Sequence, residues 1–354
     1  MAYTPTVWVA GTTALSAARM NNLETQFDEI NDKFDANTIL AANADDTPLA
    51  LTVAEQRIVG RKTGGNIAAL TVAEIKTMLA SGGYSPFGDG SDGNVTINAD
   101  TSLTRDMYYD TLTVDTTKHL YCKCFRIFAK TKIDNNGFIE DNEDKDAAVG
   151  GVGATSGGGT PLNEGSLAAV SGGGTGRRDA VGLAANNVTP ALGASGGVGG
   201  AGDDHAGGIA GTVTAPIATS GGFRSLVALI TLKQYLAAGI TKLFGGSGGG
   251  GGGGDTGNGS GGGGGAPGGT LVLASPEIDN TGGVISVSGG DGGDGCPATN
   301  AGGGGGGGGG FLALITNKLT AGTETAAAGA GGTAAGTGVN GTAGSAGTVV
   351  ELTP

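Results

Sequence analysis

The sequence predicts a mixed fold: a short N-terminal helical anchor, a β-rich middle region, and a glycine-rich region of packed polyglycine-type helices with short β-strands. Three observations predict it: an apolar heptad pattern near the N-terminus, β-forming segments in the middle, and an uneven distribution of glycine. Of the 77 glycines in 354 residues, residues 1–144 hold 10 and residues 145–354 hold the other 67. Because glycine has no side chain to bury, the second part cannot rely on an ordinary apolar core.

Residues 1–46 are expected to form a helix for attachment and oligomerisation. Ser16 suits the N-cap position, and Leu15 and Met20 have the spacing of a hydrophobic staple. Apolar residues then recur at spacings of 3, 4, 3 and 4, the a/d pattern of a coiled coil; they are Met20, Leu23, Phe27, Ile30 and Phe34. Two heptads are too few to hold a coiled coil alone, so the helix is expected to pack on copies of itself or on a partner. Packing on its own domain is the alternative.

Residues 47–83 are expected to form a small capped-helix segment. The sequence Leu-Thr-Val-Ala-Glu occurs twice, from Leu51 and again from Leu70. In the second copy Thr71 and Glu74 have the spacing of a capping box, which predicts the start of a helix there.

Residues 84–149 are predicted to be a β-rich domain, either a solenoid-like stack or a sandwich. Segments of β-forming residues recur at 95–97, 112–114 and 120–128, and Asn135-Asn136-Gly137 predicts a turn. Short strands at near-regular spacing are typical of both architectures.

Three cysteines, an odd number, do not make a disulfide framework. Cys122 and Cys124 are two residues apart in the predicted strand 120–128, so their side chains are expected on one face of it. We interpret them as buried thiols, since a second pair of metal ligands is missing.

Residues 150–354 are predicted to be a glycine-rich repeat region with a loop insertion at 150–222. A segment similar to 125–137 recurs at 271–282 and, more weakly, at 311–319. The last two copies start 40 residues apart (311 − 271), and each follows a glycine-rich tract. Repeats of this kind usually bury their faces against neighbouring repeats.

Uninterrupted glycine runs occur at 248–254, 261–265 and 302–310. Their regular position beside strands favours an ordered left-handed helix with about three residues per turn. Such a helix has no internal hydrogen bonds, so its backbone groups must pair with neighbouring helices. Disorder is one alternative. Collagen is another, because glycine recurs every third residue within 338–347, but proline is scarce and the pattern fails at Ala335.

No cofactor, metal or catalytic site is predicted. Asp203-Asp204-His205 lies in a Gly/Ala loop without the partners of a metal site. Asp291–Gly295 is similar to an acidic-glycine calcium loop but occurs once. The acids between Glu140 and Asp144 are interpreted as one charged loop. Arg177-Arg178 is a small basic island in an acidic, glycine-rich region; we interpret it as part of a solvated loop, and contact with an anionic surface sugar is the alternative.

The charge balance excludes several classes of partner. The chain has 19 basic and 32 acidic residues, a net charge of −13. Nucleic-acid backbones and anionic membrane surfaces are bound by basic residues, so we expect neither partner. The apolar runs are too short to cross a bilayer, and residues 1–10 lack the features of a secretory signal.

Three stretches of the chain together resemble bacteriophage fibre proteins. Trp8-Val9-Ala10-Gly11, with the helix that follows, is similar to the N-termini of many phage structural proteins. Residues 57–65 leading into 70–79 look like a segment common in phage tail fibres. The glycine tracts that alternate with short strands resemble glycine-rich phage fibres and adhesins with polyglycine helix bundles.

The resemblance implies a homotrimeric tail fibre or receptor-binding protein of a virion, assembled in the host cytoplasm and without catalysis. Its N-terminus would join other virion proteins, and its loops would bind a bacterial surface polysaccharide or an outer-surface protein. Candidate receptor contacts are Arg177, Arg178, Asp203, Asp204 and His205. A capsid head fibre or decoration protein, a bacterial glycine-rich surface adhesin, and a fibre-borne depolymerase are the alternatives.

Overall fold

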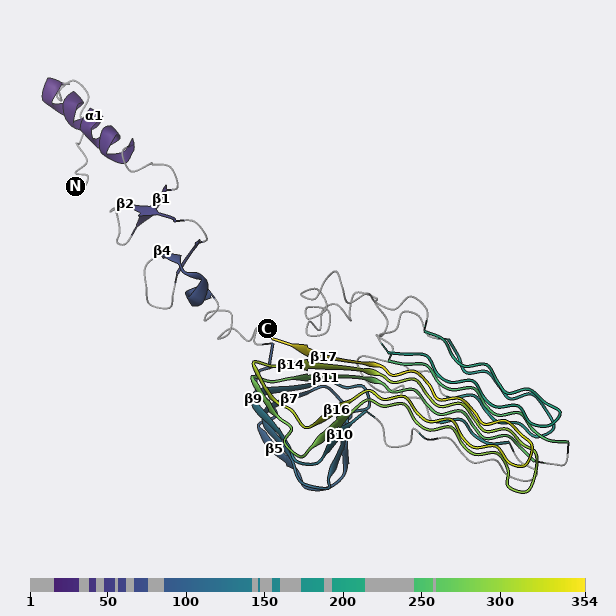
Figure 1. The fold of residues 1–354 in the computed structure, drawn as a ribbon. Helices are drawn as coiled ribbons and strands as arrows, with labels where there is room; N and C mark the ends of the chain where they lie inside the picture. The colour runs from purple at the N-terminus through teal and green to yellow at the C-terminus, as the bar shows by residue number, and fades with distance from the viewer. Residues whose placement is uncertain are drawn as a thin grey trace. The chain divides into compact units, whose positions relative to one another are not determined.

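A computed structural model of the chain divides into two compact units, Met1–Tyr84 and Ser85–Pro354. The structure describes residues 16–31, 38–42, 48–54, 57–61, 67–75, 86–141, 146, 155–159, 173–187, 193–213, 245–256 and 259–353. β-Structure predominates in these residues (Figure 1). Among the described residues, no helix has the length and apolar character needed to span a membrane.

The described residues of the first unit form one long helix and two hairpins. The helix α1 spans Ala17–Asn31 and follows Ser16, as the sequence predicts. The hairpins are antiparallel; one pairs β1 (Thr38–Ala42) with β2 (Pro48–Thr52), and the other pairs β3 (Ile58–Arg61) with β4 (Ile67–Leu70).

The predicted capping box is confirmed at the second Leu-Thr-Val-Ala-Glu copy. The Thr71 amide donates to Glu74 Oε2 at 2.8 Å, and the Glu74 amide donates to Thr71 Oγ1 at 3.1 Å. The helical turn it starts covers residues 72–75 of the described chain. Both halves of the motif satisfy amides that a helix start would otherwise leave without a partner.

The first unit has almost no interior of its own. Among its described side chains, Leu70 is the one buried hydrophobic residue, at 3% exposure. The predicted seam of α1 is open to solvent instead: Met20 is 41%, Leu23 51% and Phe27 70% exposed. The side chain of Ile30 and all of Phe34 lie outside the described residues.

The second unit is built on a parallel β-solenoid. All strand pairs among its described residues are parallel, and the chain passes repeatedly from the larger sheet to the smaller one and back, so it winds in coils. This agrees with the solenoid alternative and not with an antiparallel sandwich. The larger sheet contains β5 (Asn94–Ile97), β7 (Met107–Val114), β9 (Ile127–Asn135), β11 (Thr270–Ala274), β12 (Glu277–Asp279), β14 (Phe311–Ile315), β15 (Lys318–Thr320) and β17 (Thr348–Leu352). The smaller sheet contains β6 (Thr101–Ser102), β8 (His119–Tyr121), β10 (Phe138–Glu140), β13 (Val284–Ser286) and β16 (Thr323–Thr325).

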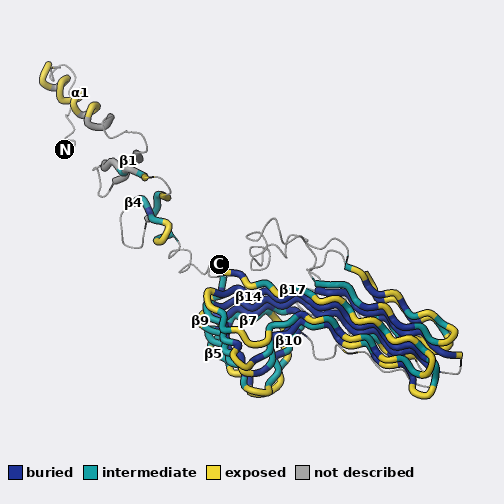
Figure 2. Tube along the Cα trace, in the orientation of Figure 1, coloured by how far each residue is buried: buried dark blue, intermediate teal, exposed yellow. Residues whose placement is uncertain are grey.

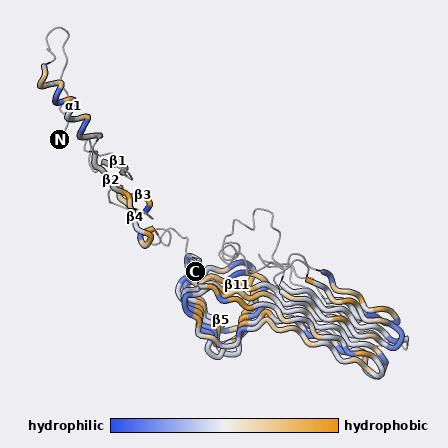
Figure 3. Tube along the Cα trace, turned by 45° about the horizontal axis from the view of Figure 1, so that its top comes forward, coloured by the Kyte–Doolittle hydropathy of each residue, from blue (hydrophilic) through white to orange (hydrophobic). Residues whose placement is uncertain are grey.

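Columns of aliphatic side chains fill the solenoid. Leu112, Ile133 and Ile278 stand in register on three successive rungs of the larger sheet, and all are fully buried. Leu120 and Ile139 form the matching column of the smaller sheet. Figure 3 shows hydrophobic residues gathered in these strands, whereas the glycine tracts are mostly pale.

Residues on either side of position 150 share the same sheets. β9 pairs with β11 and β12, although about 140 residues separate them in the chain, so the predicted regions 84–149 and 150–354 meet in one solenoid. The repeated segments occupy neighbouring rungs: Ile127 lies opposite Leu273, and Ile133 opposite Ile278. The third copy is shifted by one residue from the alignment of the sequence repeats. That alignment matches Phe311 with Leu271, whereas in the sheet Phe311 lies opposite Thr270.

The predicted strand 120–128 is wrong in its middle. The chain turns a corner between β8 and β9, where Lys123 and Cys124 have φ values of 48° and 62°. These left-handed conformations are rare outside glycine and end the strand. Cys122 and Cys124 therefore lie at a corner, but both are buried and neither forms a disulfide, as expected of structural thiols. Burial raises the pKa of the Cys122 thiol well above its ordinary value, so it is not a reactive thiolate.

The turn predicted at residues 135–137 is confirmed between β9 and β10. Asn135 is buried and donates from Nδ2 to Asn280 Oδ1 at 2.6 Å on the next coil. Asn280 in turn donates to Glu324 Oε1 at 2.7 Å. A side chain at Gly137 would place its Cβ 2.3 Å from the Asp115 carbonyl oxygen, which explains the glycine.

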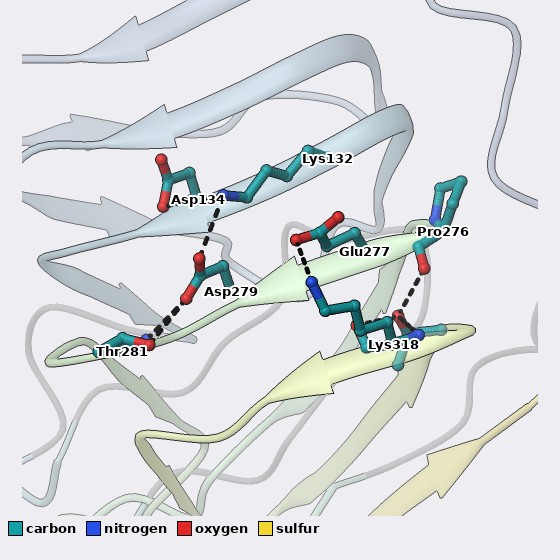
Figure 4. A network of polar contacts seen from close by, with 8 residues as sticks. Lys132, Asp134, Pro276, Glu277, Asp279, Thr281 and Lys318 are labelled. Carbon is teal, nitrogen blue, oxygen red and sulfur yellow. Dashed lines mark hydrogen bonds and ion pairs between the residues drawn. The ribbon is translucent and has the colours of Figure 1, made fainter.

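Ion pairs on the outer surface join three neighbouring rungs. Figure 4 shows Lys132 of β9 reaching Asp279 of β12, and Lys318 of β15 reaching Glu277 of β12. The Nζ–oxygen distances are 3.1 and 2.9 Å. Hydrogen bonds from Thr281 and from Lys132 hold the pKa of Asp279 below its ordinary value.

Extended segments leave the solenoid between β10 and β11, between β13 and β14, and between β16 and β17 (Figure 1). Their described residues belong to no helix and to no named strand, and they run side by side, joined by backbone hydrogen bonds. The glycine runs 248–254 and 302–310 lie in the interior of this bundle, and the run 261–265 packs beside them; all three are buried (Figure 2).

Hydrogen bonds in the bundle repeat every third residue. Within 302–310, the first set of amides donates to tract 247–253, the second to tract 339–345 and the third to tract 287–293, at N···O distances of 2.8 to 3.2 Å. Its carbonyl groups, with that of Ala301, accept amides from three further tracts, 194–200, 262–268 and 329–335. This tract therefore has six hydrogen-bonded neighbours, three on the donor side and three on the acceptor side.

The neighbours define three layers of tracts. The middle layer contains 326–335, 300–310, 245–255 and 180–187 in that order. Tracts 338–347, 193–202 and 205–213 form the layer on one side of it, and 287–296, 259–269 and 173–178 form the layer on the other side, with residues 155–159 packed outside that last layer. At each glycine of 302–310, an added Cβ would lie 1.8 to 2.2 Å from a backbone oxygen of a neighbouring tract, so only glycine fits.

Edge tracts carry side chains on the faces that meet solvent. In 338–347 the glycines at every third position face inward, and Gly341 would bring a Cβ to 1.9 Å from the Gly304 oxygen. The residues between them are mostly exposed. The glycine period that suggested collagen is thus the signature of a tract packed on one side only.

Candidate functional site

Turns from five distant parts of the glycine region meet at its far end. They lie near residues 179–180, 203–205, 256, 297–300 and 336–337. We call this group the tip. Figure 1 shows it at the end of the bundle away from the solenoid.

Side chains join these turns to one another. Asp203 Oδ1 accepts a hydrogen bond from Thr337 Oγ1 at 3.2 Å, and Asp204 Oδ2 accepts one from Thr256 Oγ1 at 2.9 Å. His205 Nε2 lies 3.2 Å from Asp179 Oδ1. The aspartates therefore tie the 203–205 turn to three other turns.

Asn300 holds the centre of the tip. Its Oδ1 accepts the Thr337 amide at 3.1 Å, its carbonyl accepts the Asp203 amide at 3.0 Å, and its own amide donates to Asp255 Oδ2 at 3.1 Å. One residue thus connects three turns by hydrogen bonds from its side chain and its backbone.

The tip backbone includes three left-handed conformations. Asp179, Ala298 and Gly336 have φ values of 44°, 63° and 56°. A non-glycine residue in this region costs about 1–3 kcal/mol, which the surrounding structure must offset. The strain is localised at the turns, whereas the tracts behind them are regular.

The structure brings all five predicted contact residues to the tip. Arg177 and Arg178 are exposed beside Asp179, which reaches His205. Asp203 and Asp204 are exposed on the adjacent turn. Thr256, Asn300 and Thr337 were not predicted. Their sequence signal is that each lies in or beside a break in a glycine-rich tract, which is where the chain reverses.

The tip offers hydrogen-bonding chemistry and little else. Its described polar side chains, with those of the adjacent Arg177 and Arg178, are carboxylates, hydroxyls, an amide, an imidazole and two guanidinium groups, and none of its described side chains is aromatic. Among the described residues of the chain, no group of three or more His, Cys, Asp or Glu side chains is placed to hold a metal ion. The surface suits a ligand rich in hydroxyl groups.

The aspartates of the calcium-like sequence hold the neighbouring tract instead. Asp291 Oδ1 accepts the Ala330 amide, and Asp294 Oδ1 accepts the Thr333 amide, both at 2.7 Å. Ser288 Oγ accepts the Ala327 amide at 3.1 Å in the same way. This ladder repeats every third residue and satisfies edge amides. Hydrogen bonds from Thr333 hold the pKa of Asp294 below its ordinary value.

The interpretation of residues 140–144 as one charged loop is wrong for its first two acids. Glu140 belongs to β10 and lies 2.9 Å from His119 Nδ1. Asp141 is fully buried and accepts the amide of Gly269, the residue before β11. It therefore fastens the point where the chain returns from the glycine bundle to the solenoid.

The chain matches no protein-family model, and no curated protein or solved structure is significantly similar to it. Its function must be argued from its own residues.

Proposed function

We propose that the chain is the receptor-binding fibre protein of a bacteriophage virion: a homotrimer whose N-terminal unit joins the particle and whose tip contacts the host-cell surface. The observation that carries this proposal is the tip, where turns far apart in sequence meet at the end of a long, side-chain-poor bundle. Recognition by loops on a rigid scaffold is a general arrangement in proteins.

The glycine tracts supply the rigid scaffold. We propose that they are polyglycine helices of the left-handed, three-residue type. The three-residue period of their hydrogen bonds and the six neighbours of 302–310 support this. At about 3.1 Å per residue, a tract of this length extends about 28 Å.

The N-terminal unit supplies the surface through which the chains associate. Its seam residues Met20, Leu23 and Phe27 are 41–70% exposed, and exposed apolar rows of this kind mark surfaces that bind another protein. Three copies on one particle would multiply weak contacts at the tip through a high effective concentration.

The tip chemistry favours a bacterial surface polysaccharide over an outer-surface protein. Sugar hydroxyls donate to and accept from carboxylates, amides and guanidinium groups, all of which lie at the tip. Protein interfaces are instead anchored by aromatic side chains, which the described tip lacks.

Immunogold labelling with an antibody against residues 150–354 tests the location. Gold on tail fibres is the expected result. Gold on the head would make the protein a capsid fibre, and gold on bacterial surfaces with none on particles would overturn the virion assignment in favour of an adhesin.

Adsorption competition tests the site. Purified protein should block phage adsorption to host cells, and the double variant Asp203→Ala, His205→Ala should block it at least tenfold less well. Glu351→Gln, an exposed change on β17, is the matched control and should compete like the wild type. Release of reducing sugar from the polysaccharide by wild-type protein would show a depolymerase and contradict a purely binding role.

A further inference from the structure

Hydrogen bonds run in one direction across the middle layer of the glycine bundle. Each tract donates to the next, in the order 326–335, 300–310, 245–255 and 180–187. Every third amide donates, and the carbonyl that accepts belongs to the residue just before it in the tract. The Gly305 amide, for example, donates to the Gly250 carbonyl, and the Gly304 carbonyl accepts the Gly332 amide. Tract 180–187 is therefore the donor edge of the layer, and tract 326–335 is its acceptor edge.

The two edges carry complementary backbone groups. At the donor edge the next amides of the series belong to Val181 and Ala184, and neither has a hydrogen-bond partner among the described residues. At the acceptor edge the next carbonyls belong to Ala328 and Gly331, and no amide of the described residues donates to them. Both sets recur every third residue, so the amides of one edge match the carbonyls of the other.

The layers beside the middle one have the same direction of donation. In that order their tracts are 338–347, 193–202 and 205–213 on one side, and 287–296, 259–269 and 173–178 on the other. All three layers therefore begin at the acceptor edge of the bundle and end at its donor edge.

We propose that the donor edge of one copy of the chain pairs with the acceptor edge of a second copy, so that bundles stand side by side and continue each other's layers. This inference goes beyond the proposed function, because it needs neither the virion nor the receptor and does not involve α1. Joining like edges would place amide against amide or carbonyl against carbonyl. The contact is therefore head to tail, with different surfaces meeting on the two copies.

The hydrogen bonds also set the register of the contact. Three of them cross the layer at one height along the tracts: Gly251 to Leu183, Gly305 to Gly250, and Gly332 to Gly304. Ala184 and Gly331 adjoin the two ends of this path, so they lie at about the same height on opposite edges. Copies that stand level, with their tips at the same end, therefore bring the Ala184 amide to the Gly331 carbonyl.

The edges fit a second copy better than an unrelated partner. Neither edge tract has a charged residue, in a chain with a net charge of −13. The donor edge exposes Val181 (52%) and Leu183 (40%), and the acceptor edge offers mainly alanine and glycine for them to pack on. In an adjacent layer, the exposed Arg177 lies at the height of Cys296, close to the exposed Asp294. Level copies therefore also join opposite charges.

A proline at the donor edge tests the contact. Ala184→Pro removes one amide of the open series, and its ring obstructs a second tract, while its fixed φ of about −65° suits a three-residue helix. The concentration for half-dissociation of the oligomer should rise about tenfold or more. Ala343→Pro is the matched control, because Ala343 is exposed and its amide lies outside the series that donates along its layer. It should leave dissociation within about twofold of the wild type.

Thiol cross-linking in the full-length protein tests the head-to-tail arrangement. Val181→Cys places a thiol on the donor edge, and Ala334→Cys places one at the matching height on the acceptor edge. A short bifunctional thiol reagent should join copies of the double variant into covalent oligomers. Each single variant should stay unjoined, because like edges do not meet. The native cysteines are all buried, so they do not compete for the reagent.

The outcomes separate this inference from the proposed function. Cross-linking of the double variant alone, with weaker association of Ala184→Pro than of Ala343→Pro, supports the edge contact. An oligomeric mass by light scattering without cross-linking of the double variant overturns the edge contact and leaves the proposed homotrimer standing. Equal cross-linking of a single variant overturns the head-to-tail pairing. A single-chain mass for the wild type overturns both the edge contact and the homotrimer.

Discussion

The solenoid and the glycine bundle of the second unit are two solutions to the same problem. The solenoid excludes water with aliphatic columns such as Leu112, Ile133 and Ile278, each contributing about 1.5–3 kcal/mol by burial. The bundle excludes water with backbone alone, and its amides bond across tracts. The comparison shows that the distance between neighbouring backbones determines how large a side chain can fit between them.

The same rule operates inside the bundle. Tract 302–310 has neighbours on all sides and is glycine throughout, whereas 338–347 has neighbours on one side and is glycine at every third position. The glycine content of a tract therefore indicates how many of its faces pack against other tracts. Four substitutions test this contrast between the two interiors.

The solenoid should be most sensitive to a cavity. Ile133→Ala removes a fully buried side chain between two rungs and should lower the free energy of unfolding by about 2–5 kcal/mol. Chemical denaturation measures it. Val349→Ala, at a position 41% exposed on β17, is the control. An equal loss in both variants would mean that the aliphatic columns are not the interior of the solenoid.

The glycine bundle should be sensitive to the opposite change, an added methyl group. Gly305→Ala would place a Cβ 2.1 Å from the Gly197 oxygen, so overpacking should cost about 1–3 kcal/mol. Gly157→Ala is the matched control, because nothing lies within 4 Å of its added Cβ. Thermal unfolding of the two variants measures the difference. A melting temperature of Gly305→Ala equal to that of Gly157→Ala would contradict close packing of the tracts.

A substitution at the edge of the bundle should lower the free energy of unfolding by a smaller amount. Asp294→Ala removes the acceptor of the Thr333 amide and hydroxyl, at 2.7 and 2.6 Å, and should cost about 1 kcal/mol because the site is exposed. Ser345→Ala, an exposed change in the edge tract 338–347 on the opposite side of the bundle, should be neutral in the same melting experiment.

The effect of Asp294 should depend on pH. Since its pKa is lowered in the folded state, its contribution is complete above the unfolded pKa of about 3.9 and disappears as the pH falls through the folded value. The melting temperatures of wild type and Asp294→Ala should therefore converge below about pH 4. A constant difference from pH 7 to pH 3 would assign the loss to packing instead.

The smallest effect should come from the surface ladder of the solenoid. Lys318→Ala removes the pair with Glu277, which is largely exposed, and should cost less than about 0.5 kcal/mol, decreasing further in high salt. Denaturation midpoints at low and high salt measure this. A loss comparable to that of Ile133→Ala would show that charge, and not the aliphatic columns, sets the register.

Local chemistry made part of the fold predictable. The α1 heptad, the Thr71–Glu74 capping box and the turn after Asn135 each depend on residues within a few positions, so the sequence alone locates them. The corner at Lys123 and Cys124 could not be predicted, because no glycine marks the left-handed backbone conformation of these two residues.

Local sequence patterns could not predict which distant residues lie close together in the fold. Arg177 and His205 were singled out as isolated loop residues, but nothing in their spacing shows that Thr337 and Asn300 would join the same tip. Their meeting depends on the matched lengths of tracts more than 100 residues apart. The glycine period at 338–347 was visible in the sequence, while its cause, the contact with 302–310, was not.

The period of three has a consequence for how the gene can change. A run such as 302–310 is indifferent to phase, since every position is the same residue. In 338–347 a gain or loss of one codon would turn the side chains inward, whereas a change of three codons would keep the inward glycines and lengthen the tract by one turn. We therefore expect natural length variants of the edge tracts to differ by multiples of three residues, so that the reach of the bundle evolves in steps of about 9 Å.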